Sequence, residues 1–273
     1  MKTFALALSG GGARGLAAIA VLEVLDELGV KPSAIAGVSI GAVLGAAYGA
    51  GMPAKAVRRA VLDIAHRRSQ TLGKLMQVRA TPFSKMFSSN LGNPMLLDAE
   101  KLAAAFLPDI VPDDFAALGV PLTVIATDLY GRSEVAFTAG PLRTAIAASI
   151  AIPGLLKPVE VDGRILIDGG AVNPLPFEHL RGKADVVIAV DNTVGPSEGR
   201  GIPQPWECLL ATFQVMGHVI ATEKLKHGAP HLILRQDMSL FRLLDFFQAS
   251  SILRVAEQKK AEIREKILGV IGN

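Results

Sequence analysis

The chain of 273 residues contains a single cysteine, Cys208, which excludes an internal disulfide and a cysteine metal cluster. A free thiol usually behaves as a small hydrophobe, so we expect Cys208 to be buried. Aromatic residues make up only 5% of the chain although half of it is hydrophobic. The core must therefore consist mainly of Ala, Val, Leu and Ile. A chain of this length favours one domain, residues 1–273.

The sequence also lacks a leader-like hydrophobic run. The apolar start at 3–8 is interrupted by Ser9-Gly10-Gly11-Gly12, so we expect a first strand, no signal peptide and a cytoplasmic protein. Pro32–Ala54 has no charge, and its glycines stand four apart, as in packed transmembrane helices. It is mainly Ala and Gly rather than the Leu, Ile and Phe that drive insertion. We therefore expect a helix lying very close to a sheet.

Short apolar runs alternate with helical periodicity, which predicts a parallel sheet covered by helices. Strands are expected at 3–8, 35–38, 122–127, 134–138, 158–162, 164–167, 185–190 and 232–234. Helices are expected at 16–28, 40–50, 142–149, 206–225 and 250–268, so residues 200–273 form a mainly helical C-terminal part. Asp162-Gly163 is a strong hairpin turn signal between two of these strands.

Positive charge is concentrated in one segment. Residues 53–90 contain eight Lys or Arg and one acid, Asp63, in a chain whose net charge is only +3. We expect a helix to about Arg68 and then a loop-rich excursion to residue 97 with Met76, Phe83, Met86 and Phe87. Two interpretations stay open: a solvated loop, or peripheral contact with anionic head groups at roughly 1 kcal/mol per basic residue.

Ser39 is the candidate nucleophile. It lies in Gly37-Val38-Ser39-Ile40-Gly41, between an expected strand and an expected helix. Gly-x-Ser-x-Gly forms a strained strand-to-helix turn that exposes Oγ, and flanking side chains would clash there. The free amides of the helix N-terminus stabilise nearby negative charge. The alternative is an N-cap serine in a tight turn.

A second motif follows the first strand: Ser9-Gly10-Gly11-Gly12-Ala13-Arg14-Gly15. It satisfies the dinucleotide fingerprint, which also demands an acid about 20 residues later. No acid lies between Lys31 and Asp63, and no Gly-Lys-Ser/Thr forms a P-loop. Adjacent amides without side chains suit an oxyanion hole instead. Adjacent parallel strands would bring this loop and Ser39 to one sheet edge. Arg14 would anchor the loop or attract an anionic substrate.

Asp168 is the better candidate base. It ends an expected strand and begins Asp168-Gly169-Gly170, where apolar neighbours would raise the pKa of its carboxyl. None of the five histidines lies in a recognisable catalytic loop. A Ser39-Asp168-His179 triad has the chain order of α/β-hydrolases, but those enzymes place several strands before the nucleophile and only one precedes it here.

Together these segments resemble the patatin-like phospholipase family. The resemblance rests on the Gly10–Gly15 loop, the Ser39 turn and the Asp168-Gly169-Gly170 motif, in that order. It also includes Ala148-Ser149-Ile150-Ala151-Ile152-Pro153, which looks like a stretch that precedes the aspartate in the family. Order and spacing agree over residues 3–176, and the last hundred residues carry no matching motif.

The resemblance implies a three-layer α/β/α sandwich with a mainly parallel central sheet, and hydrolysis of acyl esters in lipids. It assigns Ser39 and Asp168 to a catalytic dyad and Gly10, Gly11 and Gly12 to the oxyanion hole. Arg14, Gly15, Gly37, Gly41, Gly169 and Gly170 would support the site. We expect no metal, cofactor or nucleic-acid partner, and the oligomeric state stays open. The alternative is a non-hydrolytic protein that binds lipid or nucleotide through the glycine loop.

Overall fold

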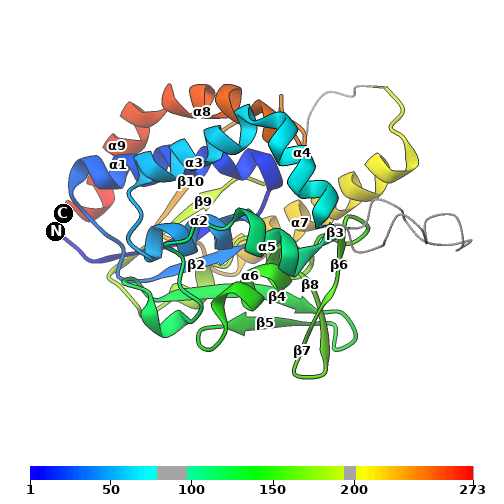
Figure 1. Cartoon of the computed structure of the whole chain (residues 1–273). Helices are drawn as coiled ribbons and strands as arrows, with labels where there is room; N and C mark the ends of the chain where they lie inside the picture. Colours follow the sequence, from blue (N-terminus) through cyan, green and yellow to red (C-terminus); the bar gives the residue numbers. More distant parts are fainter. Residues whose placement is uncertain (79–96, 194–200, 273) are drawn as a thin grey trace, which may run out of the picture.

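The computed structural model describes residues 1–78, 97–193 and 201–272, and the statements below concern these residues (Figure 1). Within them, eight strands form one sheet in the order β10-β9-β1-β2-β4-β8-β7, with β5 paired to β4. The strands are β1 (Phe4–Leu8), β2 (Ile35–Val38), β4 (Leu122–Asp128), β5 (Ser133–Phe137), β7 (Val159–Val161), β8 (Arg164–Asp168), β9 (Val186–Asp191) and β10 (Leu232–Arg235). A second small sheet pairs β3 (Leu97–Asp98) with β6 (Leu156–Lys157).

The sheet is mainly parallel, as expected. β10, β9, β1, β2 and β4 run in one direction, whereas β5, β7 and β8 pair antiparallel. Leu8, the last residue of β1, pairs with Gly37 of β2. The loop after β1 and the turn after β2 therefore leave the sheet side by side, which confirms the predicted neighbourhood of the two motifs.

Two strands share one edge of β4. Ile125 pairs with Val38 of β2, and the next residue, Ala126, pairs with Asp168 of β8. Both positions also pair with β5, which occupies the other edge of β4. Because a strand has only two edges, β2 and β8 must lie end to end on the same one. The residues that follow Val38 therefore meet Asp168 directly.

The helices cover the two faces of the sheet unequally, because side-chain size alternates along the strands. Phe4, Leu6 and Leu8 of β1 pack into the larger cluster, whereas Ala5 and Ala7 face the smaller one. The larger cluster is covered by α1 (Ala18–Leu28), α2 (Ile40–Gly49), α3 (Ala54–His66), α5 (Ala99–Phe106), α6 (Leu142–Ile150), α8 (Ala249–Glu257) and α9 (Lys260–Ile271). The smaller is covered by η5 (Phe177–Leu180) and α7 (Pro205–Lys226). These layers form the expected α/β/α sandwich, and Figure 1 shows α1, α3, α8 and α9 packed together.

Helix α2 lies unusually close to the sheet. A methyl group built on Gly41 would stand 2.3 Å from the carbonyl oxygen of Leu8, and one on Gly45 would stand 3.1 Å from Ile35 Cγ2. Small residues are therefore required for this contact, as the sequence predicted for Pro32–Ala54. In the described ranges, no helix has both the length and the apolar character needed to cross a membrane.

The predicted hairpin is present. β7 and β8 pair antiparallel around Asp162 and Gly163, whose φ angles are 49° and 74°. Two successive positive φ angles are characteristic of the type I′ turn that matches strand twist. The turn reverses the chain, so that β8 pairs antiparallel with β4 and Asp168 lies opposite Ala126.

The basic segment differs from its prediction. After α3 the chain forms another helix, α4 (Arg68–Gln77), where a loop was expected. No proline interrupts residues 68–77, and Leu, Lys, Met and Gln are good helix formers. Phe83, Met86 and Phe87 lie outside the described residues, so the predicted excursion there stays a prediction.

Arg58 does not belong to a free basic surface. Its Nε and Nη2 donate to the two carboxylate oxygens of Glu23 at 2.6 and 2.8 Å, and it also contacts Glu257. Glu23 is only 3% exposed. Arg58 therefore joins α3 to α1, while five other basic residues of α3 and α4 and the turn between them are exposed: Lys55, Arg59, Arg67, Arg68 and Lys74.

The C-terminal part contains two helices rather than the single one expected at 250–268. The chain turns between α8 and α9, and Ile252 and Ala256 before the turn are buried like Ile263 and Ile267 after it. In a continuous helix Lys260 would fall on the same buried stripe. The turn instead lets its ammonium contact Glu27, with Glu23 at 3.4 Å.

Candidate active site

Ser39 occupies a strained turn between β2 and α2. Its φ of 55° and ψ of −126° are rare for a residue with a side chain, and its neighbours hold it there. A methyl group on Gly37 would lie 2.6 Å from the Gly41 carbonyl oxygen. Only glycine therefore fits at these two flanking positions, as expected for a nucleophile turn.

Asp168 lies within direct hydrogen-bonding distance of this serine. Ser39 Oγ donates to Asp168 Oδ2 at 2.7 Å, and the Gly170 amide donates to Asp168 Oδ1 at 2.7 Å. The carboxylate is 1% exposed. Desolvation raises the pKa of Asp168 to about 6, against the lowering effect of the hydrogen bonds from Ser39 and Gly170. The carboxyl is therefore ionised at neutral pH yet more basic than an ordinary aspartate.

Ser149 contacts the turn that contains Ser39, the candidate nucleophile. Its Oγ accepts a 2.8 Å hydrogen bond from the Ser39 amide and donates at 2.6 Å to the Ile125 carbonyl. Two residues later, the Ala151 carbonyl accepts from the Asp168 amide at 3.0 Å. The segment that contains both thus contacts each member of the pair. The sequence identified this segment by resemblance and offered no signal for its role, because its partners are distant in the chain.

The backbone around Asp168 is fixed by contacts from β4. Thr127 Oγ1 donates to the Asp168 carbonyl at 2.9 Å. A methyl group on Gly169 would stand 2.3 Å from the Ile125 carbonyl oxygen, so this position also admits only glycine. The predicted pair Gly169-Gly170 therefore has two uses: close approach to β4, and an amide for the carboxylate.

The glycine loop lies against the serine, but its first amide is occupied. A methyl group on Gly10 would stand 3.4 Å from Ser39 Cβ. The Gly10 amide donates to the Pro174 carbonyl at 3.2 Å, so it does not supply an oxyanion donor in this arrangement. Ser9 Oγ donates to the Gly10 carbonyl at 3.0 Å and accepts from the Asn192 amide at 2.7 Å. These hydrogen bonds fix the position of Ser9, where the glycine loop begins.

The next two amides are available. Within the described ranges, no group accepts a hydrogen bond from the amides of Gly11 or Gly12. Both glycines have positive φ, 135° and 57°, and a methyl group on Gly12 would stand 2.3 Å from the Leu243 carbonyl oxygen. A loop that keeps amides unpaired beside a nucleophile is the expected form of an oxyanion hole. Gly15 packs against Ile40 of α2.

Arg14 acts as an anchor in this structure. It is 5% exposed, and its Nη2 hydrogen-bonds to Gln214 of α7. Desolvation lowers the pKa of Arg14 to about 10, partly offset by the carboxylate of Asp245. The contact ties the glycine loop to α7. Gln214 was not identified from the sequence.

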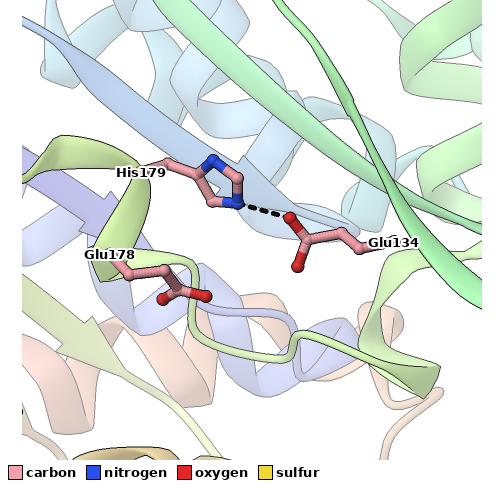
Figure 2. Close-up of side chains that lie close together, drawn as sticks. All are labelled: Glu134, Glu178 and His179. Carbon is pink, nitrogen blue, oxygen red and sulfur yellow. Dashed lines mark hydrogen bonds and ion pairs between the residues drawn. The ribbon is translucent and has the colours of Figure 1, made fainter.

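The histidine alternative is not assembled. His179 Nε2 hydrogen-bonds to Glu134 of β5 (Figure 2). Both Asp168 oxygens accept hydrogen bonds from other groups, Ser39 and Gly170. His179 lies in η5, on the face of the sheet that α7 covers. The Ser39-Asp168-His179 triad is therefore absent from the described arrangement.

Glu134, Glu178 and His179 form a compact cluster of the kind that can bind a metal (Figure 2). Side chains of the protein already donate hydrogen bonds to both of its carboxylates. Asn173 Nδ2 donates to Glu134 and Glu178 at 2.7 and 2.8 Å, and the Lys224 ammonium contacts Glu178. The Lys224 ammonium offsets one of the two carboxylate charges, and Asn173 satisfies an oxygen of each carboxylate. We interpret the cluster as an ion-pair network that fastens α7 to η5 and β5.

Comparisons with known proteins identify the family of the chain. The family described as patatin-like phospholipase matches residues 6–181. The chain is 40% identical over 188 residues to an uncharacterized NTE family protein of Mycobacterium tuberculosis, covering 68% of this chain and 48% of that protein. It is 31% identical over 193 residues to human patatin-like phospholipase domain-containing protein 6, covering 70% of this chain and 13% of that protein.

Solved structures also resemble the chain over most of its length. VipD from Legionella pneumophila gives a TM-score of 0.49 at 13% identity, covering 97% of this chain and 67% of that one. Human GIVD cytosolic phospholipase A2 gives 0.47 at 9% identity, covering 99% and 63%. The chain spans about half the length of the mycobacterial relative. Because the family match covers more than half of the chain and includes the Ser39, Asp168 and glycine-loop segments, the chain belongs to the patatin-like phospholipase family.

Proposed function

We propose that the chain is a serine acyl hydrolase that cleaves acyl esters of phospholipids or lysophospholipids. The observation that carries the proposal is the 2.7 Å hydrogen bond from Ser39 Oγ to Asp168 Oδ2 in a buried, strained turn. A serine hydroxyl is a weak nucleophile until a base takes its proton. Asp168 is the base in contact with it, and burial makes that carboxylate more basic.

The first half-reaction forms an acyl-enzyme. Ser39 Oγ attacks the ester carbonyl while Asp168 Oδ2 accepts the hydroxyl proton. The carbonyl oxygen becomes an oxyanion, which the Gly11 and Gly12 amides bind. When the tetrahedral intermediate collapses, the ester C–O bond breaks and Asp168 returns its proton to the departing alkoxide. The products are an alcohol or lysolipid and a Ser39 ester.

The second half-reaction restores the enzyme. Asp168 accepts a proton from water as the water oxygen attacks the Ser39 ester, and the same amides bind the new oxyanion. The bond to Ser39 Oγ then breaks, Oγ recovers the proton from Asp168, and a fatty acid leaves. Each preorganised donor contributes on the order of 10²–10³ in rate. The Gly10 amide takes no part because Pro174 accepts from it.

The test is hydrolysis of p-nitrophenyl acyl esters and labelling by a fluorophosphonate. We expect Ser39→Ala and Asp168→Asn to lower kcat by a factor on the order of 10⁴ or more. The label should appear on the peptide that contains Ser39. Ser250→Ala is the matched control, because the Ser250 hydroxyl contacts His66 away from the pair.

Wild-type rates in either variant would reject the dyad, and circular dichroism spectra verify that both variants are folded. A labelled wild type that hydrolyses no phospholipid or lysophospholipid but cleaves p-nitrophenyl esters would keep the serine hydrolase and reject the lipid substrate. An unlabelled wild type that still binds lipid would support the non-hydrolytic alternative.

A further inference from the structure

Helix α7 is not composed like an ordinary surface helix. Such a helix turns an apolar stripe to the core and charged residues to solvent. Residues 208–222 of α7 contain no Asp, Glu, Lys or Arg. These 15 residues form a segment about 22 Å long, at about 1.5 Å per residue. The helix is therefore apolar on the side that it buries and also on the side that it exposes.

The inner side of α7 contacts the candidate active site. Phe213 packs on Gly170, with its ring 3.5 Å from a methyl group placed there. Gln214 receives the hydrogen bond from Arg14 of the glycine loop. Gly217 approaches the Gly170 carbonyl. The helix is therefore a wall of the site rather than a distant element.

The outer side carries eight uncharged residues at helical spacing. They are exposed and share one side of α7: Cys208, Leu209, Ala211, Thr212, Val215, Met216, Val219 and Thr222. Between 53% and 62% of the surface of Leu209, Val215, Met216 and Val219 is exposed. The expectation that Cys208 is buried is therefore wrong. The expectation rested on the usual behaviour of a free thiol as a small hydrophobe, whereas Cys208 lies on an exposed face of α7.

Other exposed apolar residues lie on a segment that borders the same site and on α4. Leu240 and Phe246 flank Leu243, whose carbonyl accepts from the Ala13 amide of the glycine loop. Leu72 and Met76 of α4 are each more than half exposed. Figure 1 shows α4 and the first turns of α7 at the end of the molecule opposite the N-terminus. Exposed apolar residues thus occur beyond α7, and those around Leu243 lie on a segment that contacts the glycine loop.

We propose that the outer face of α7 binds the surface of a phospholipid bilayer, with the helix lying parallel to it. The uncharged segment is too short to span the hydrocarbon core, which needs about 20 residues, but suits an interfacial helix. A lipid partner suits the outer face of α7 for two reasons. The face carries no charged residue between 208 and 222, and the helix that carries it also contacts the candidate active site. The choice of lipid rests on the proposed function, because the inner side of the same helix contacts Gly170 and the glycine loop beside Ser39.

Binding is measured with Ser39→Ala protein, so that hydrolysis does not alter the vesicles. We expect this protein to float with vesicles of phosphatidylcholine alone. Leu209→Asp with Met216→Asp should lower the vesicle partition coefficient roughly tenfold or more. Ile110→Asp with Leu268→Asp is the matched control, since these apolar residues are 49% and 42% exposed on other elements. Leu209→Ser with Met216→Ser repeats the test without added charge.

Cys208 supplies a native probe, because it is the only cysteine and lies on the proposed face. A nitroxide attached to it should become accessible to oxygen and inaccessible to a nickel chelate when vesicles are added. The control moves the thiol away, with Cys208→Ser and Ile110→Cys. Its nitroxide should stay accessible to the nickel chelate.

Equal flotation of the Leu209/Met216 variants and the Ile110/Leu268 control would overturn the proposal. So would a wild-type dimer in analytical ultracentrifugation that Leu209→Ser with Met216→Ser dissociates, since a second copy would then cover the face.

Thermal melts establish that each variant is folded. In the Ser39-containing background, the Leu209/Met216 variants should keep p-nitrophenyl acetate hydrolysis within about twofold of wild type. Failure of the proposed function would appear as a wild type that hydrolyses no ester, whereas failure of this inference would appear as equal flotation of the Leu209/Met216 variants and the Ile110/Leu268 control.

Discussion

Ser39 and Asp168 meet because the strands that carry them end on the same edge of β4. Val38 pairs with Ile125, and Asp168 pairs with the next residue, Ala126. The antiparallel direction of β8 brings the end of that strand toward the end of β2. A dyad can therefore form without a loop that reaches across the sheet. Its precision depends on the backbone of β4 and on the side chains that link β4 to the nucleophile turn.

Ser149 is the first of these links to test. Ser149→Ala removes the acceptor of the Ser39 amide and leaves that buried amide unpaired. Misplacement of a reacting group by about 1 Å lowers rates about 100-fold, so we expect kcat to fall by roughly 10- to 100-fold with KM nearly unchanged. Steady-state kinetics on a soluble ester measure both constants.

Ser33→Ala is the control for this change. The Ser33 hydroxyl also donates to backbone carbonyls, those of Phe4 and Lys183, but at the other end of the strands. It should keep wild-type kcat. If both variants lose activity in proportion to their loss of melting temperature, Ser149 acts through stability and not through position.

The pH dependence of kcat/KM reports the base in the free enzyme. Asp168 must be ionised to accept the Ser39 proton, and burial raises the pKa of this carboxyl to about 6. We therefore expect kcat/KM to rise about tenfold per pH unit below pH 6 and to level off above it. Circular dichroism between pH 5 and 8 verifies that the protein stays folded. A midpoint near 4 would mean that the base is an ordinary, solvated carboxylate.

The same carboxylate should destabilise the folded chain at neutral pH. Its pKa is raised from 3.8 when unfolded to about 6 when folded, so the folded state favours the protonated form. Its favourable contribution is complete below pH 3.8 and is lost as pH rises through 6. The difference corresponds to about 3 kcal/mol at about 1.4 kcal/mol per pKa unit. Asp168→Asn, which does not titrate, should therefore gain stability relative to wild type as pH rises.

Urea unfolding of both proteins at several pH values between 4.5 and 8 measures this difference. The wild-type free energy of unfolding should fall relative to that of Asp168→Asn over this window, most steeply below pH 6. The comparison cancels the titration of every other group that the two proteins share. A constant difference across the window would show that folding does not raise the pKa of Asp168.

Local patterns predicted the parts of the site that depend on local chemistry. Alternation around Asp162-Gly163 gave the hairpin, and the glycines around Ser39 gave the strained turn. Apolar runs gave the strands of the sheet. The end-to-end placement of β2 and β8 was beyond such patterns, because it depends on β4 pairing with two segments that lie 87 and 42 residues away in the sequence (Val38 with Ile125, and Asp168 with Ala126).

Long-range hydrogen bonds set the other limit of prediction. The Gly10 amide was expected in the oxyanion hole, but Pro174 accepts from it. Composition gives no sign of that partner, which lies more than 160 residues away. Arg58 was counted with a basic surface, although Glu23 accepts from it in the fold. In each case the local pattern identified a group that can donate hydrogen bonds, but a tertiary contact determined which acceptor it binds.

Arg58 offers a direct test of that distinction. Arg58→Ala leaves the nearly buried Glu23 with only the more distant ammonium of Lys260, at 3.4 Å. Breaking a buried ion pair by removing one partner typically destabilises a protein by about 3–5 kcal/mol. We expect the lower end, about 3 kcal/mol in urea unfolding, because Lys260 offsets part of the loss.

Lys55→Ala is the matched control, since Lys55 lies on the same helix, is exposed and has the same charge. Its free energy of unfolding should stay within about 0.5 kcal/mol of wild type. If the basic segment binds anionic lipid, the variant with the smaller effect on stability, Lys55→Ala, should have the larger effect on lipid binding. Flotation with phosphatidylglycerol vesicles should then weaken for Lys55→Ala and stay unchanged for folded Arg58→Ala, whose guanidinium is already paired with Glu23 and Glu257. Equal destabilisation by both substitutions would mean that the Glu23–Arg58 contact adds nothing to the fold.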